Sequence, residues 1–232
     1  MKIAVMQPYF FPYIGYFQLM ASVDRFVLFD NVQYIRQGWI NRNRILLNGK
    51  PSVITLPLKK DSRFKHINCR QISDTFSDTK LLNQLREAYR HAPYQEEVLP
   101  LVEKILNSES ENLFDYLLHS LNVLRDALTL NCEILISSDI PINHDLRAQD
   151  KILAICKELD AHTYINLPGG RALYDVEAFE QHGVSLCFLQ PETFHYQQLT
   201  DEFVPWLSII DVMMFNHREV VSRLCHERWV LN

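Results

Sequence analysis

The order of elements in residues 1–30 constrains the fold of this chain more than any other feature. Residues 2–6 (KIAVM) predict a short strand, and residues 26–29 (FVLF) predict a second one. Between them lie a Pro12-to-Gly15 turn and an apolar segment with helical character. A strand, a crossover helix and a second strand in this order predict two parallel neighbours in one sheet.

Short apolar strands and helices alternate along the rest of the chain, which is typical of a parallel sheet covered by helices. Asn48-Gly49-Lys50 lies between two β-prone runs, 44–47 and 52–56, and predicts a hairpin. The expected helices span 80–91, 96–106, 113–128, 147–159, 176–182, 206–215 and 218–225. Further strands are expected at 133–137, 163–166 and 184–189, with a short one near 66–72.

Together these patterns predict one α/β domain over residues 1–232. Its sheet is expected to be mostly parallel and open, with a β-hairpin insertion and a helical segment at about 75–130. A composition of 47% hydrophobic and 22% charged residues is that of a globular protein. No apolar run approaches the roughly eighteen residues of a membrane span, so we expect a cytoplasmic protein without one. Homo-oligomerisation stays open.

The cysteines argue against disulfide and metal chemistry. The chain has five, widely scattered and without a CxxC pair. Most lie in apolar surroundings, which indicates reduced, buried thiols. The spacing of zinc ligands is absent too, and no metal site is expected.

The net charge of −5 conceals a strongly basic segment. Between Arg36 and Arg70 there are nine Lys or Arg residues and one acidic residue, Asp61. The rest of the chain carries fourteen basic and twenty-seven acidic residues. A basic segment on an acidic protein favours a small anionic ligand over nucleic acid, and a solvated basic hairpin is the alternative.

Polar side chains follow the first two predicted strands, where open α/β sheets bind their ligands. Gln7 and Gln33 each offer an amide to a hydroxyl or carboxylate. Asp30 is a candidate general base, with metal ligation or turn formation as alternatives. In a strand, Arg42 and Arg44 share one face, where two guanidinium groups suit a phosphate or carboxylate. Trp39, Asn41 and Tyr16 belong to the same candidate site.

Two later segments add candidate ligand contacts. Asn166 is followed by Gly169 and Gly170, and a Gly-Gly loop after a strand lets backbone N–H groups approach an anion. A tight turn is the alternative there, with Tyr174 close behind. Ser208 and Asp211 are either a helix cap or ligand contacts. His66, in the basic segment, is the candidate acid or base among the nine histidines.

Four motifs in this order resemble the WbqC-like family over essentially the whole chain. The motifs are QPYFFPYIGYFQLM, FDNVQYIRQGWINRNRI, YINLPGGRALYD and FVPWLSIIDVMMFN. The resemblance implies a bacterial protein encoded among genes for surface polysaccharides such as O-antigen or capsule. It also implies a set of functional positions, which in this chain are Gln7, Pro8, Pro12, Gly15, Tyr16, Asp30, Trp39, Asn41, Arg42, Asn166, Gly169, Gly170, Tyr174, Ser208 and Asp211. The last motif departs from the family at VMMFN, a conservative change.

A second resemblance is to nucleotidyltransferase-like α/β enzymes, whose first strand leads into an HxGH motif. Here Tyr13 and Tyr16 stand in place of the two phosphate-binding histidines. The likeness therefore implies a fold and leaves the use of ATP open.

These features predict an enzyme of surface-polysaccharide biosynthesis that transfers an acyl or aminoacyl group to a sugar or sugar nucleotide. Arg42 and Arg44 would hold the anionic group, and Asp30 or His66 would accept a proton. The co-substrate stays open, an acyl thioester or a nucleotide being the candidates. Two alternatives are an adenylate-forming or nucleotidyl-transferring enzyme and a non-catalytic partner of a biosynthetic enzyme or carrier.

The geometry expected of the site follows from the parallel sheet. The ends of parallel strands meet at one edge. We therefore expect the loops at 7–16, 30–44 and 166–175 to converge on one pocket, with 203–216 as a wall. Asp30 and Asn166 are expected to face each other across its mouth.

Overall fold

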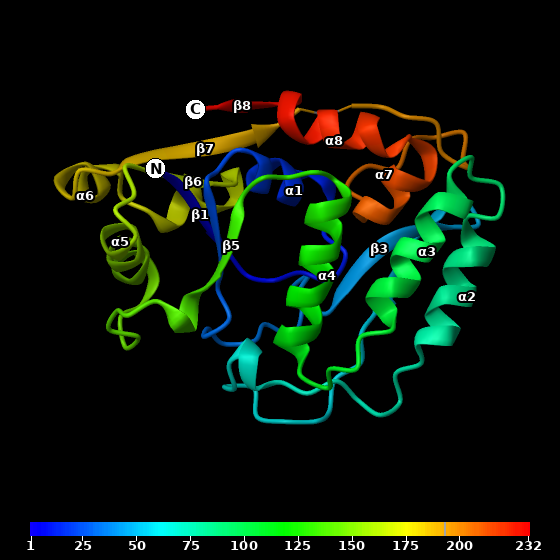
Figure 1. Cartoon of the computed structure of the whole chain (residues 1–232), viewed down its shortest axis with the longest axis horizontal. Coiled ribbons are helices and arrows are strands. Elements are labelled where there is room, and N and C mark those ends of the chain that lie inside the picture. The colour runs from blue at the N-terminus through cyan, green and yellow to red at the C-terminus, as the bar shows by residue number, and fades with distance from the viewer. Residues whose placement is uncertain (193) are drawn as a thin grey trace.

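A parallel sheet with one antiparallel edge strand forms the centre of the computed structural model, which describes residues 1–192 and 194–232 (Figure 1). In sheet order, the six strands are β5 (Glu133–Ile136), β2 (Arg25–Leu28), β1 (Lys2–Met6), β6 (Thr163–Asn166), β7 (Ser185–Pro191) and β8 (Trp229–Leu231).

The predicted strand–helix–strand opening is confirmed. β1 pairs in parallel with β2, with Ala4 opposite Phe26 and Met6 opposite Leu28. The helix between them, α1 (Ile14–Ala21), makes the crossover. The mixed α/β class is confirmed as well, whereas the antiparallel edge strand β8 was missed because three residues are too short for a periodic signal.

The strand order reverses beside β1. Strands β2 and β5 lie on one side of β1, and β6 and β7, which come later in the chain, lie on the other side. In open α/β sheets the crevice at such a reversal, outside the carboxyl ends of the strands, is the usual place for a ligand. Gln7 and Asn166 stand at these two strand ends.

The predicted hairpin forms a separate sheet of two strands, β3 (Arg42–Leu47) and β4 (Lys50–Thr55). Asn48 and Gly49 make its two-residue turn with φ values of 51° and 71°. Positive φ at both positions is what a tight hairpin turn requires, and Asn-Gly supplies it at low cost. Ile45 and Ile54 turn inward and bury against the main core.

Helices form close to the predicted ranges. Beside α1 they are α2 (Asp78–Ala88), α3 (Gln95–Leu106), α4 (Leu113–Ala127), α5 (Ala148–Glu158), α6 (Val176–Gln181), α7 (Ile209–Phe215) and α8 (Arg218–Glu227). None of the described helices is long and apolar enough to cross a membrane.

Two predicted elements need correction. The helix expected from residue 206 begins at Ile209, because the Ser208 side chain caps it by accepting from the Ile210 N–H. The short strand expected near 66–72 is a 3-10 helix, η1 (Ile67–Cys69), flanked by isolated bridges at His66 and Ile72. Further 3-10 helices span η2 (Ser137–Asp139) and η3 (Pro168–Leu173).

Alternate strand residues divide the interior into two cores. On β1, Ile3 and Val5 belong to a smaller core under α5 and α6, whereas Ala4 belongs to a larger core on the opposite face. In Figure 1, α5 and α6 lie to the left of the sheet and α2, α3 and α4 to its right.

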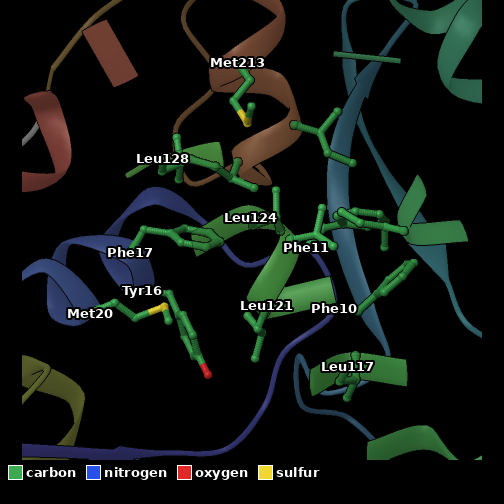
Figure 2. Close-up of a cluster of buried hydrophobic side chains, with 14 of the residues drawn as sticks. Phe10, Phe11, Tyr16, Phe17, Met20, Leu117, Leu121, Leu124, Leu128 and Met213 are labelled. Atoms are coloured by element: carbon green, nitrogen blue, oxygen red, sulfur yellow. The ribbon is translucent and has the colours of Figure 1, made fainter. Parts of the chain in front are cut away.

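Helix α4 carries the predicted apolar stripe and uses it to cover the opening segment. Figure 2 shows Leu117, Leu121 and Leu124 of α4 facing Phe10 and Phe11. All five side chains are buried, and this packing fixes the loop that follows β1.

The hairpin turn provides a test of this fold. Replacing Gly49, at φ +71°, with Val should lower the free energy of unfolding by about 1–2 kcal/mol, because a Cβ is crowded in the left-handed region. Lys50→Val, next to it on β4, is the control and should change stability little. Urea denaturation of both variants measures the difference, and equal midpoints would contradict this account of the turn.

Candidate functional site

The basic segment folds into a cleft, here called the basic cleft, with a volume of about 610 Å³. Its walls come from the loop after β2, from strand β3 and from residues 55–63 and 70 beyond β4. The lining residues are Tyr34, Arg36, Asn41, Arg42, Thr55, Pro57, Leu58, Lys59, Lys60, Asp61, Arg63 and Arg70. Six Lys or Arg side chains against one carboxylate give the cleft a positive potential.

Arg70 is the most deeply placed cation of the cleft, with only 7% of its surface exposed. One guanidinium nitrogen donates to the Ser62 carbonyl at 3.1 Å, and the group lies 4.8 Å from the centre of the Tyr34 ring. Its Nε is buried without an acceptor. A largely buried guanidinium at the wall of a cleft is suited to pairing with a bound anion, because solvent screens its charge little.

Tyr34 and Asn41 form the polar floor beside Arg70. The Tyr34 hydroxyl donates to Asn41 Oδ1 at 2.7 Å, and Asn41 Nδ2 donates to the Leu56 carbonyl at 2.8 Å. Burial raises the pKa of Tyr34, while the charges of Arg70, Arg42 and Arg36 act to lower it. The three guanidinium groups therefore act on one point inside the cleft.

Arg42 is held by the loop that precedes it. Its Nε donates to the Gly38 carbonyl at 3.0 Å and a terminal nitrogen donates to the Gln37 carbonyl at 2.6 Å. The opposing charge at the rim, Asp61, is paired with Lys65 at 2.6 Å, and this pairing lowers the pKa of the Asp61 carboxyl. Lys59 is also paired, with Asp74 at 3.0 Å and with Glu111 at 3.4 Å, so five of the six cations of the cleft have no carboxylate partner among the described residues.

A second cavity, here called the aromatic pocket, lies on the same side of the hairpin and has a volume of about 200 Å³. Residues Tyr9, Tyr13, Trp39, Asn43, Arg44 and Trp206 line it. Segments 7–16, 30–44 and 203–216 thus meet there as expected, whereas the 166–175 loop does not line it.

Trp39 lines the aromatic pocket and lies beside one arginine of each cavity. The Arg42 and Arg44 guanidinium groups lie 5.9 Å and 5.6 Å from the centre of its ring, within the range of cation–π attraction. Arg42 lines the basic cleft and Arg44 lines the aromatic pocket. The two arginines expected on one face of a strand therefore serve adjacent cavities.

Ser208 fastens the three segments of the aromatic pocket to one another. Its N–H donates to the Arg44 carbonyl and its hydroxyl donates to the Phe11 carbonyl, both at 2.8 Å. The next N–H, of Ile209, donates to the Pro12 carbonyl at 2.8 Å. The capping role considered from the sequence is therefore present, combined with a crosslink between distant loops.

Asp211 is a fully buried carboxylate that accepts three hydrogen bonds. Tyr89 donates to Oδ1 at 2.9 Å, and Tyr196 and Gln198 donate to Oδ2 at 2.6 Å and 3.0 Å. Burial raises the pKa of Asp211 although these donors act to lower it. The geometry gives Asp211 a structural task, and a ligand contact for it stays a prediction.

Asp30 is buried as well, and its carboxylate is occupied. Oδ1 accepts from the Ser138 N–H at 2.9 Å and Oδ2 accepts from Asn68 at 2.7 Å. Nearby, burial lowers the pKa of Lys151, and the charge of Asp30 acts to raise it. These bonds tie the loop after β2 to the residues after β5 and to η1. They fit the structural alternative that was considered for Asp30. Its catalytic role stays a prediction.

The Asn166 side chain forms its hydrogen bonds with residues of its own segment, 164–174. Its Nδ2 donates to the Tyr164 and Tyr174 hydroxyls at 3.0 Å and 3.2 Å, and its Oδ1 accepts from the Leu167 N–H. Asp30 and Asn166 therefore do not point at each other. A Cβ on Gly170 would lie 2.9 Å from Asn166 Nδ2, so this glycine permits close packing, whereas Gly169 faces open space.

The remaining predicted residues lie at the protein surface or in the core. Tyr16 is fully buried and donates to the Gln7 carbonyl at 3.0 Å. Gln33 and His66 are exposed, and Gln33 donates to the Arg63 carbonyl at 3.0 Å. His66 faces Gln33 in an isolated β-bridge. Ligand roles for these residues stay predictions.

Several cavity residues were not singled out from the sequence. In the basic cleft these are Tyr34, Arg36, Lys59, Lys60, Arg63 and Arg70. The local excess of positive charge marked the whole segment, but not which of its side chains turn inward. Among the described residues, no group of three His, Cys, Asp or Glu side chains is placed to hold a metal ion.

Comparisons with known proteins identify one family. The sequence model of the WbqC-like protein family matches residues 7–223. The uncharacterized protein Rv1507c of Mycobacterium tuberculosis is 27% identical over 219 residues, covering 93% of each chain. No solved structure matches the chain significantly.

The buried carboxyl of Asp211 should make stability depend on pH. A carboxyl whose pKa is raised on folding adds stability at pH values below its unfolded pKa, which is 3.8, and this contribution is lost as the pH rises through the folded pKa. The loss amounts to about 1.4 kcal/mol for each unit of pKa increase.

Asp211→Asn removes this ionisation, so the free energy of unfolding of the variant should depend less on pH in this range. Urea unfolding of both proteins between pH 4 and pH 9 measures it, with the difference between the two curves isolating Asp211. Parallel curves would show that Asp211 has an ordinary pKa in the folded protein.

Proposed function

The chain belongs to the WbqC-like protein family, and from this premise we propose that it is a cytoplasmic enzyme of bacterial surface-polysaccharide biosynthesis. Its substrate is an anionic sugar precursor, for which a sugar nucleotide is the leading candidate. The reaction is transfer of an acyl or aminoacyl group to that sugar. The surface-polysaccharide context comes from the family resemblance, and the anionic substrate comes from the site.

The basic cleft is the observation that carries this proposal. Six cationic side chains line it, and five of them, all but Lys59, have no carboxylate partner among the described residues. Guanidinium groups bind phosphate oxygens through two parallel hydrogen bonds, which is stronger and more directional than a contact from a surface lysine. A diphosphate matches the charge of the cleft, and the volume of about 610 Å³ leaves room for a larger ligand that carries one.

Within this scheme the protein positions the sugar to attack an activated acyl donor, an acyl thioester or a nucleotide-linked acid, whose thiol or nucleotide leaves as the bond to the sugar forms. The cleft holds the diphosphate, and the sugar lies next to Trp39 at the boundary with the aromatic pocket. Holding the attacking group in place lowers the barrier by removing the entropy loss from the reaction step. His66 is the accessible candidate base, since it is exposed between Arg63 and Arg70 of the cleft and the Asp30 carboxylate is already hydrogen-bonded.

A nucleotidyl-transferring or adenylate-forming activity is the second candidate. One observation favours it, namely the reversal of strand order beside β1, where related sheet arrangements bind nucleotides. Binding of ATP in preference to a sugar nucleotide would support this alternative.

Arg36→Gln tests the basic cleft. Arg36 is exposed and lines the cleft, so its loss should leave the fold intact. One lost charge-assisted contact costs about 1.5–3 kcal/mol, so the Kd for UDP-glucose and for pyrophosphate should rise by roughly tenfold or more. Isothermal titration calorimetry measures both, and wild-type affinity should fall as salt is raised.

Arg86→Gln is the matched control for this experiment. Arg86 is an exposed arginine on α2, outside the cleft, and its replacement removes the same charge from the protein. Both ligands should bind this variant as they bind the wild type. If the two variants behave alike, or if neither ligand binds the wild type, the basic cleft is not the substrate site.

A further inference from the structure

The aromatic pocket has features that the basic cleft does not explain. Two of its tryptophans are partly exposed, Trp39 by 40% and Trp206 by 51%. The ring of Tyr13 meets that of Trp206 edge-on at 5.9 Å. Flat apolar walls of this kind pack against ligands that have flat apolar faces of their own. The volume of about 200 Å³ is below the roughly 300–1,000 Å³ of sites for drug-sized ligands, which restricts the occupant to one ring.

The backbone at this pocket is strained. Phe11 and Trp206 have φ values of 45° and 59°, in the left-handed region that bulky residues rarely adopt. Hydrogen bonds hold both residues in place. The Ser208 hydroxyl donates to the Phe11 carbonyl, and the Arg44 guanidinium donates to the Trp206 carbonyl at 3.2 Å. Strained backbone that the surroundings hold in place is concentrated at ligand sites.

The polar groups available in the pocket are hydrogen-bond donors. Arg44 lines the pocket, and the one side-chain hydrogen bond it makes with the described residues is from a terminal nitrogen to the Trp206 carbonyl. The Tyr9 and Tyr13 hydroxyls make no hydrogen bond with any described residue, and burial raises the pKa of Tyr13 to about 12, so this hydroxyl keeps its proton at neutral pH. The pocket therefore offers one positive charge and neutral donors.

Acceptors are missing from the same lining. No carboxylate is among the lining residues. The Asn43 amide is fully engaged, because Nδ2 donates to the Phe10 and Phe11 carbonyls and Oδ1 accepts from the Arg44 N–H. An ammonium group would meet the positive charge of Arg44 and no carboxylate, whereas a carboxylate would meet that charge and two hydroxyl donors.

We propose that the aromatic pocket binds a pyranose ring that carries a carboxylate, that is, an acidic sugar. The C–H faces of the ring pack against the aromatic walls, and the carboxylate is held by Arg44 with the tyrosine hydroxyls donating to ring oxygens. This proposal deepens the proposed function, on which it rests for the link to a nucleotide. Because the Trp39 ring lies within 6 Å of both Arg42 and Arg44, a sugar in this pocket lies close to a diphosphate in the basic cleft.

The three tryptophans of the chain make this directly measurable. Trp39 and Trp206 line the pocket, whereas Trp229 lies on the edge strand β8. Titration with free glucuronate should change the tryptophan fluorescence of the wild type and of Trp229→Phe in a saturable way. The combined variant Trp39→Phe, Trp206→Phe should lose the signal. Glucose and glucosamine should bind at least tenfold more weakly than glucuronate.

Arg44→Gln tests the carboxylate contact. It should raise the Kd for glucuronate at least tenfold and leave that for glucose unchanged, while Arg86→Gln should behave as the wild type. Arg44→Lys, which keeps the charge, should recover part of the affinity and serves if the Gln variant does not fold. Equal binding of glucuronate to wild type and to both Arg44 variants would overturn the proposal, as would saturable binding of uridine or glucosamine in place of glucuronate.

The outcome is separable from that of the proposed function. Pyrophosphate binding depends on Arg36 and requires no sugar, and glucuronate binding depends on Arg44 and requires no phosphate. Pyrophosphate binding without glucuronate binding would overturn the acidic-sugar proposal alone. Glucuronate binding without pyrophosphate binding would support the acidic-sugar pocket and contradict the anion role of the cleft.

Discussion

The rest of the site depends on the buried polar pair at the start of α7, Ser208 and Asp211. Asp211 accepts from Tyr89, whose hydroxyl in turn accepts from the Leu46 N–H at 3.2 Å, so the carboxylate fixes strand β3 through α2. Ser208 binds the Phe11 and Arg44 carbonyls. Buried polar groups are costly unless they are satisfied, and a fully satisfied set of this kind permits one arrangement of these segments. The hairpin and the opening loop are thereby held at a fixed separation.

That fixed separation explains how one short strand serves two cavities. Arg42 and Arg44 are two residues apart, on one face of β3, and Trp39 lies within 6 Å of both. The Arg42 side is rich in positive charge and the Arg44 side is rich in aromatic rings. A ligand with a strongly anionic end and a ring would match this division. The chemistry of each cavity differs, since charge dominates one and shape with donor placement dominates the other.

Local patterns predicted most of the elements and located the basic segment that lines the cleft. The Asn-Gly turn, the apolar stripe of α4 and the strand–helix–strand opening are short-range signals, and each appears where it was expected. Individual site residues were harder to predict, because Asp30, Asn166 and Asp211 read alike in sequence as polar residues after apolar runs. Asp30 and Asp211 are instead occupied by partners far along the chain, Ser138 and Tyr89, and Asn166 is occupied by the nearby hydroxyls of Tyr164 and Tyr174.

The sequence by itself determined the parallel α/β sheet, the hairpin and the concentration of positive charge between Arg36 and Arg70, since periodicity, turn chemistry and composition are properties of contiguous residues. Only the tertiary structure decided which of those cations share a cavity, that Arg42 and Arg44 serve separate cavities, and that Trp206 lies beside Tyr13. The contact of Trp206 with Tyr13 and the hydrogen bonds from Ser208 to Phe11 and Arg44 join residues more than a hundred positions apart. They follow from the packing of α7 against the hairpin, which no local pattern encodes.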